Sequence, residues 1–409
     1  MSLYSLLLLV ILNLFFPKNE VEIKSLRTYK TGDETSFPIL DFVNEKNPTI
    51  TIEFDIRSVS TPDMSILFRF CDKDWIPYDN IFLANPGYNK AYNLWYDVLP
   101  ITVNGAMYHF NGTFPNFDVT FPFSGKWKYF ITDAYDNDLV YASGKFIIVY
   151  PDVPLFVNLR KEKQQDVIST PNALDRIYSI RVDFDLPDTL FPLNVQNIEI
   201  IDNQKIGYPI IIDKDTYNRN RYYEWNGAKK FSFTANNIKP GNEYRTIDIR
   251  DQNRFSPPTV FAQYDGIETS RFYILGGRDL NGGSILTSFK NEYAEYMYVA
   301  FRLRPPENLM RRIFLTGAFT DWQVLPQYEM YNENGLYKIT IELKRGRYDY
   351  QYVTGEIAGN EVVDIDWEIL EGNYWEALND YHVFLYYNEP QLGGYDRIIG
   401  YVKIKSGDL

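Results

Sequence analysis

The chain has 409 residues, a length that suggests about two to four domains. It is 45% hydrophobic and 17% aromatic, which excludes wholesale disorder, and its 34 Tyr and 28 Phe favour strands. The net charge of -13 argues against nucleic acid as a partner, because an acidic surface repels phosphate. Cys71 is the single cysteine, so internal disulfides are excluded.

The first residues differ in composition from the rest of the chain. An apolar run extends from Leu3 to Phe16, broken only by Ser5 and Asn13. A bilayer span needs about 18 apolar residues, so this run fits the apolar region of a secretory signal better than an anchor. No Lys or Arg precedes it and no Ala-x-Ala site follows it, so a retained anchor and a buried strand stay open as alternatives. We predict a signal segment at residues 1–17 and an exported protein.

Strand signals recur at short spacing through residues 21–150, the first predicted domain. In "NPTITIEFDI" the apolar residues alternate with polar ones, as in a half-buried strand. "SGKWKYFITDAYDNDLVYASGKFIIVY" (124–150) indicates a hairpin that turns at "DND". The block ends at Pro151–Pro154, where two prolines disfavour both helix and central strand.

Two further blocks of strands follow. We predict a second domain over residues 154–275, a Gly-rich connecting loop over 276–295 and a third domain over 296–405. Short strands at this spacing, with turn residues between them, are typical of sandwiches of about 100 residues. The predicted fold is therefore all-β, with three tandem immunoglobulin-like (E-set) β-sandwich domains.

The residue types needed for catalysis are scarce. His109 and His382 are the two histidines, and each lies in an alternating aromatic strand, where a packed side chain is the usual outcome. "VVDIDWEIL" places Asp364, Asp366 and Glu368 on one strand face. A glycosidase needs carboxylates on both sides of a bond, so we interpret this face as solvated and keep a glycosidase as a minor alternative.

Metal and cofactor sites are not indicated either. "TDAYDND" (132–138) offers aspartates that suit calcium, but it lacks the Gly and distal Glu of an EF-hand loop, and a hairpin tip is the preferred interpretation. One Cys and two His leave almost no ligands for zinc. We predict no catalytic residue, no metal site and no cofactor.

The stretch "LTGAFTDW" (315–322) resembles the first strand and turn of glycogen- and starch-binding β-sandwich modules. "GLYKITIELKRGRYDYQYV" resembles their paired strands. This resemblance implies that Trp322 would stack on a sugar ring, with Trp367 and Asn379 as further candidates. The alternative is that Trp322 serves the core, and we favour it because the binding set is incomplete.

Motifs spread along residues 23–405 resemble the plug protein family of the type IX secretion system of Bacteroidetes. They are "RFCDKDW" (69–75), "YHFNGTFPNFDVTFPFSGKWKYFI" (108–131), "GNEYR" (241–245) and "LEGNYWEALNDYHVFLYYNEPQLGGYDRIIGY" (370–401). Their order, with the sugar-module-like domain last, carries the resemblance.

The resemblance implies a non-enzymatic periplasmic protein that docks on a giant outer-membrane β-barrel translocon and closes its periplasmic mouth. It implies a protein partner, no membrane insertion of the mature chain and an association with the outer membrane. "YDYQY" (348–352) and "FLYYN" (384–388) are candidate docking surfaces, since Tyr is enriched at interfaces. The alternative is a periplasmic or surface glycan-binding protein that uses the third domain.

Overall fold

The computed structural model describes residues 21–164, 174–214, 218–263, 266–271, 279–286, 295–307 and 309–408. The predicted signal segment and parts of the predicted Gly-rich loop lie outside these ranges. Within them the chain consists of strands, turns and five short 3-10 turns, so the all-β prediction is confirmed. The 3-10 turns are η1 (Pro192–Asn194), η2 (Ala318–Thr320), η3 (Pro326–Tyr328), η4 (Gln391–Gly393) and η5 (Ser406–Asp408).

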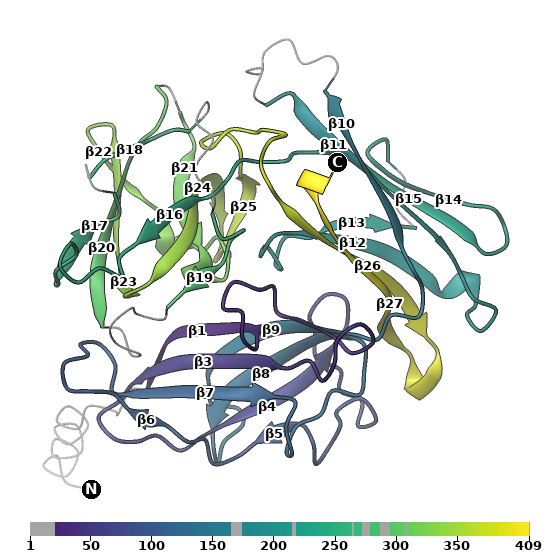
Figure 1. Cartoon of the computed structure of the whole chain (residues 1–409), viewed down its shortest axis with the longest axis horizontal. Helices are drawn as coiled ribbons and strands as arrows, with labels where there is room; N and C mark the ends of the chain where they lie inside the picture. Colours follow the sequence, from purple (N-terminus) through teal and green to yellow (C-terminus); the bar gives the residue numbers. More distant parts are fainter. Residues whose placement is uncertain are drawn as a thin grey trace, which may run out of the picture.

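Six sheets of the described residues stack as three pairs, which we call the first, second and third sandwiches (Figure 1). The strand orders of the first sandwich are β1-β3-β7-β6 and β2-β9-β8-β4-β5. Its strands are β1 (Glu22–Lys30), β2 (Ile39–Asp41), β3 (Ile50–Arg57), β4 (Met64–Cys71), β5 (Lys90–Ala91), β6 (Asp97–Val98), β7 (Tyr108–Phe114), β8 (Gly125–Asp133) and β9 (Val140–Val149). The alternating apolar residues of β3 are fully buried in the core between these sheets.

The second sandwich has strand orders β10-β11-β15-β14 and β13-β12-β26-β27. Its strands are β10 (Phe156–Lys163), β11 (Arg176–Asp185), β12 (Val195–Asp202), β13 (Ile210–Asp213), β14 (Arg221–Trp225), β15 (Lys230–Ile238), β26 (Asp380–Glu389) and β27 (Tyr395–Lys405). The residues of β26 thus pack in one core with those of β11 and β15. In Figure 1 the yellow C-terminal strands lie beside β12.

This placement differs from the predicted domain division. Residues 380–405 were assigned to the third domain, yet β26 pairs with β12 of the second sandwich, from Val195↔Tyr387 to Asp202↔Tyr381. The reason is that alternation along a strand defines which face is buried but not which strand lies alongside. The second sandwich is therefore built from two separate stretches of chain.

The third sandwich lies between those two stretches. Its strand orders are β16-β24-β19, with β21 and β25 also on β24, and β17-β20-β23-β22, with β18 also on β20. Its strands are β16 (Arg245–Asp248), β17 (Thr259–Phe261), β18 (Glu268–Thr269), β19 (Ser284–Ile285), β20 (Tyr296–Arg304), β21 (Arg312–Gly317), β22 (Tyr331–Glu333), β23 (Leu336–Lys344), β24 (Arg347–Ala358) and β25 (Glu361–Asp366). Strands β16 to β18 were expected in the second domain, and β19 falls within the predicted Gly-rich loop.

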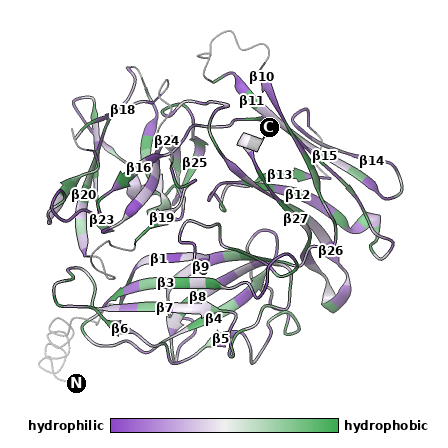
Figure 2. Ribbon diagram, in the orientation of Figure 1, coloured by the Kyte–Doolittle hydropathy of each residue, from purple (hydrophilic) through white to green (hydrophobic). Residues whose placement is uncertain are grey.

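The sandwiches contact one another through both apolar and polar side chains. Between the first and second, Phe37, Ile147, Phe384 and Ile398 belong to one buried apolar cluster. Figure 2 shows apolar and polar positions interleaved along the strands of every sandwich, so no sandwich has a wholly apolar outer sheet. The contacts therefore combine local apolar clusters with the polar pairs described below.

Candidate functional site

The predicted sugar-stacking residue Trp322 lies in the interior. Only 1% of its surface is exposed, and its indole N–H donates a hydrogen bond of 2.7 Å to the carbonyl of Gly282. The ring of Tyr244 lies 4.4 Å away, centroid to centroid. A Cβ on Gly282 would lie 2.9 Å from the indole nitrogen, so the turn at 282 has to approach without a side chain. Trp322 therefore offers no face to a sugar ring and packs the junction between sandwiches.

The other two sugar candidates do not form an open platform with it. Trp367 is half-buried, with Tyr208 edge-on at 5.2 Å and the ammonium of Lys205 4.5 Å above its ring. Asn379 is buried, where it accepts a hydrogen bond from Asn203 and donates one to the carbonyl of Pro240, at 2.9 and 2.7 Å. These contacts hold the segment before β26 against the end of β12 and the connection that follows β15.

The two stretches predicted as docking surfaces are in fact buried. All five residues of "YDYQY" are buried, as are four of the five of "FLYYN". On the outward side of β24, the carboxylate of Asp349 accepts hydrogen bonds from the backbone N–H of Leu280 and Gly282 at 2.5 and 3.0 Å, and Gln351 donates to the carbonyl of Trp367. Chain segments thus cover both faces of the strand, and this prediction was wrong.

Neither histidine is placed for catalysis. His382 stacks on Phe37 at 4.2 Å, and burial lowers the pKa of its imidazole to about 3, with Lys403 adding to the effect. His109 lies 2.7 Å from the carboxylate of Asp55, which also accepts a hydrogen bond of 2.8 Å from the hydroxyl of Tyr296. Lys344 completes this group at 2.8 Å from Asp55. Because Tyr296 and Lys344 belong to the third sandwich, the group joins it to the first.

The carboxylates named from the sequence have local roles. Asp366 accepts hydrogen bonds from the backbone N–H of Glu368 and Ile369, and Lys239 pairs with Glu368 at 3.2 Å, while Asp364 is exposed. Asp133 and Asp136 accept backbone N–H bonds within the tip 133–138, as expected for a hairpin turn. Across the described ranges, no group of three or more His, Cys, Asp or Glu could hold a metal ion. No helix of those ranges is long and apolar enough to cross a membrane.

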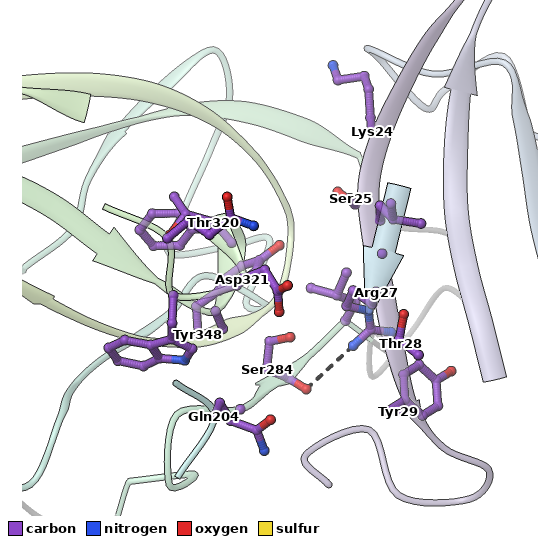
Figure 3. A pocket seen from close by; sticks show the side chains of 18 of the residues that line it. Lys24, Ser25, Arg27, Thr28, Tyr29, Gln204, Ser284, Thr320, Asp321 and Tyr348 are labelled. Carbon is purple, nitrogen blue, oxygen red and sulfur yellow. Dashed lines mark hydrogen bonds between the residues drawn. The ribbon is translucent and has the colours of Figure 1, made fainter. Parts of the chain in front are cut away.

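A cleft of about 510 Å³ lies where the three sandwiches meet. Figure 3 shows the side chains of β1, among them Lys24 and Arg27, on one wall, and Thr320, Asp321 and Tyr348 of the third sandwich on the other. Gln204 of the second sandwich closes one side and donates a hydrogen bond of 3.0 Å to the carbonyl of Thr35. The described residues that line the cleft include no His and no Cys.

The charges in the cleft are mostly paired across it. Lys24 binds Glu342 at 2.8 Å, and Arg27 binds Glu34 and Glu53 at 2.9 and 2.7 Å while also reaching the carbonyl of Ser284 at 3.4 Å. The contacts of Lys24 with Glu342 and of Arg27 with the carbonyl of Ser284 link the first sandwich to the third, whereas Glu34 and Glu53 bind Arg27 within the first. They give this part of the cleft a structural role, since Lys24 and Arg27 are already bound by carboxylates of the protein.

Asp321, on the wall formed by the third sandwich, is not part of the ion pairs described above. Its backbone is left-handed, with φ 52°, and its side chain points into the cleft, where part of it remains exposed to solvent. Burial raises the pKa of Asp321 to about 6, and Lys145 across the cleft acts in the opposite direction. Ionisation of Asp321 is therefore less favourable in the cleft than in bulk water.

One end of the first sandwich has a different character. The turns at residues 58–63 and 134–139 and the segment 92–98 lie there, and they carry large apolar side chains that are exposed to solvent. Sequence reasoning missed this surface because the segments lie between strands, where composition alone does not say which side chains face water.

A comparison with protein families finds a match for the first sandwich. Residues 23–150 match the family model described as the type 9 secretion system plug protein 1st domain. The predicted resemblance to the plug protein family is thus confirmed over these residues. Against curated proteins, the sequence gives no match.

One of two solved structures found by comparison shares the fold of this chain. A hypothetical protein from Parabacteroides merdae is 18% identical, with a TM-score of 0.75 over 95% of this chain and 100% of that one, which shows a shared fold. A structure described as giving insight into host cell surface retention of a 1.5-MDa bacterial ice-binding adhesin is 8% identical over 94% of this chain and 95% of that one. Its TM-score of 0.14 carries no argument.

Proposed function

We propose that this chain, which belongs to the type IX secretion plug family through its first domain, closes the periplasmic mouth of a giant outer-membrane β-barrel by protein–protein docking. The observation that carries the proposal is the match of residues 23–150 to the plug-family model. The role is non-enzymatic, and its place is the periplasm, at the inner face of the outer membrane.

The way the sandwiches are joined supports this role. A plug has to keep its shape when it fills an opening, and flexible linkers between sandwiches would work against that. Here buried pairs join the first sandwich to each of the other two. Lys126 of the first sandwich binds Glu199 of the second at 2.8 Å, and Asp55 of the first binds Lys344 of the third. Both pairs are almost fully buried, so the three sandwiches present one fixed outline.

The proposal is tested by purifying the C-terminally tagged full chain from detergent-solubilised envelopes and identifying the proteins that accompany it by mass spectrometry. We expect a very large β-barrel protein in comparable amount. A strain that lacks the gene should show altered secretion or a leakier envelope. Recovery of the chain alone from the soluble periplasmic fraction, together with normal secretion and an unchanged envelope in the deletion strain, would refute the proposal.

A further inference from the structure

Three segments that are distant in sequence converge at one end of the first sandwich. The backbone N–H of Ala134 donates to the carbonyl of Asp63 at 3.0 Å, which joins the turns 58–63 and 134–139. Lys90, just before the third segment, donates to the side chain of Asn137 at 2.6 Å. Tyr96, within the segment 92–98, lies close enough to Asp63 and Tyr141 for their charges to affect its hydroxyl. The three segments therefore form one surface.

Apolar side chains stand out from this surface. Their exposed fractions are 90% for Trp95, 88% for Tyr135, 80% for Val59, 74% for Val98 and 61% for Tyr92. Folding gains nothing from side chains held so far out of the core. Exposed apolar groups that gather in one place usually mark an interaction site, and Trp and Tyr are the residues most often found at the centre of such sites.

The same segments carry a strong negative charge. Residues 58–63, 92–98 and 133–140 contain five aspartates and no Lys or Arg, and the cation Lys90 lies beside them, 5.0 Å above the Tyr92 ring. The aspartates are Asp63, Asp97, Asp133, Asp136 and Asp138. We call this surface, with its five apolar and five acidic side chains, the aspartate-rimmed end. A partner that covers it has to supply positive charge around an apolar contact, because like charges at an interface oppose binding.

We propose that the aspartate-rimmed end is the face by which the chain docks on the barrel, and that the barrel meets it with an apolar patch bordered by Lys and Arg. This inference rests on the proposed function and adds the docking face and the partner's chemistry to it. The charge distinguishes this partner from two others. Anionic headgroups repel an acidic surface, and a second copy of the chain would bring five aspartates against five.

The test compares variants of the full tagged chain for the amount of barrel recovered from solubilised envelopes. Trp95→Ala combined with Tyr135→Ala removes the two most exposed rings of the aspartate-rimmed end, and we expect recovery to fall about tenfold or more. Asp63→Lys combined with Asp138→Lys reverses two charges of the rim, and we expect a similar fall. Recovery with the unchanged chain should decrease as NaCl rises from about 50 to about 500 mM, because salt screens the charges.

Matched controls separate this face from other exposed rings. Phe156→Ala and Tyr331→Ala remove side chains that are 67% and 61% exposed on the second and third sandwiches, and they should leave recovery unchanged. Thermal unfolding should be the same for every variant, since none of the changed side chains is buried.

The outcomes distinguish the two proposals. If the unchanged chain brings down no barrel, the proposed function fails. If it brings down the barrel but the aspartate-rimmed variants do so equally well, the docking face is elsewhere and only this inference is overturned. Trp95-dependent binding of the purified chain to protein-free phosphatidylglycerol vesicles, or Trp95-dependent dimerisation, would also overturn it.

Discussion

The pair Lys126–Glu199 offers the sharpest test of how the first and second sandwiches are held together. The side chains are 2% and 1% exposed, and the ammonium also donates to the carbonyl of Lys73 at 2.7 Å. Lys126→Met keeps the length and apolar stem of the side chain but leaves the carboxylate without its cation. Breaking a buried pair in this way destabilises proteins by about 3–5 kcal/mol, and we expect a loss in that range.

The loss should depend on pH in a defined direction. Burial already raises the pKa of Glu199, and Lys126 is the main opposing influence, so its removal raises that pKa further. When a carboxyl has a higher pKa in the folded chain than in the unfolded chain, where it is about 4.3, the free energy of unfolding depends on pH. It decreases as the pH rises from the unfolded pKa through the folded pKa. Lys126→Met should therefore be more destabilising at pH 7.5 than at pH 4.5.

Urea denaturation followed by Trp fluorescence measures the effect at both pH values. The double variant Lys126→Met with Glu199→Leu removes both charges of this pair. Its stability should return close to that of the unchanged chain. Arg57→Met is the control, because its partner Glu22 lies 3.4 Å away with both side chains 52% exposed, and we expect a change of at most about 1 kcal/mol. A Lys126→Met variant no less stable than Arg57→Met, or a double variant as unstable as the single one, would refute the reasoning.

Two further predictions concern the junction of the sandwiches. Trp322→Ala should destabilise the chain by about 3–5 kcal/mol in denaturation, because it empties a buried site, whereas retardation of the chain in α-glucan gels should be the same with and without the ring. Glucan retardation that depends on Trp322 would restore the sugar-binding alternative. Asp321→Asn keeps a residue that tolerates the left-handed backbone and removes a carboxyl whose pKa is raised to about 6. Since the ionised form is disfavoured in the folded chain, we expect a higher Tm than the unchanged chain at pH 7.5 and an equal Tm near pH 4; equal Tm at both values would contradict the assigned position of Asp321.

The sequence predicted which side chains of a strand face the core better than it predicted which parts of the chain lie against that strand. In β3 the alternation identified Ile50, Ile52, Phe54 and Ile56 as core residues, and they are fully buried. The same strand carries Asp55 on its other face, and the sequence read that face as exposed. The third sandwich covers it, and no local pattern shows that a partner almost 300 residues away will supply the lysine.

The candidate sites show the same limit. Tyr348 to Tyr352 alternate as a half-exposed strand would, yet a turn at 280–282 and the segment after β25 cover the outer side. The exposed rings of Trp95 and Tyr135 lie between strands, where the pattern of alternation stops and gives no information. Family motifs identified the first domain correctly because they combine the residue types at many positions along the chain. The alternation within a single strand uses only a few positions.

The route of the chain has a consequence for how the protein matures. Strand β12 is made early and pairs with β26, which begins some 180 residues later at Asp380. Until the final stretch has been delivered, β12 keeps an unpaired edge, and such edges promote association between chains. A protein that crosses a membrane from its N-terminus onward would expose this edge during most of its transit. The second sandwich can therefore be completed only when the last 30 residues, which contain β26 and β27, have arrived. We expect a chain cut after the third sandwich to lose the second sandwich as well.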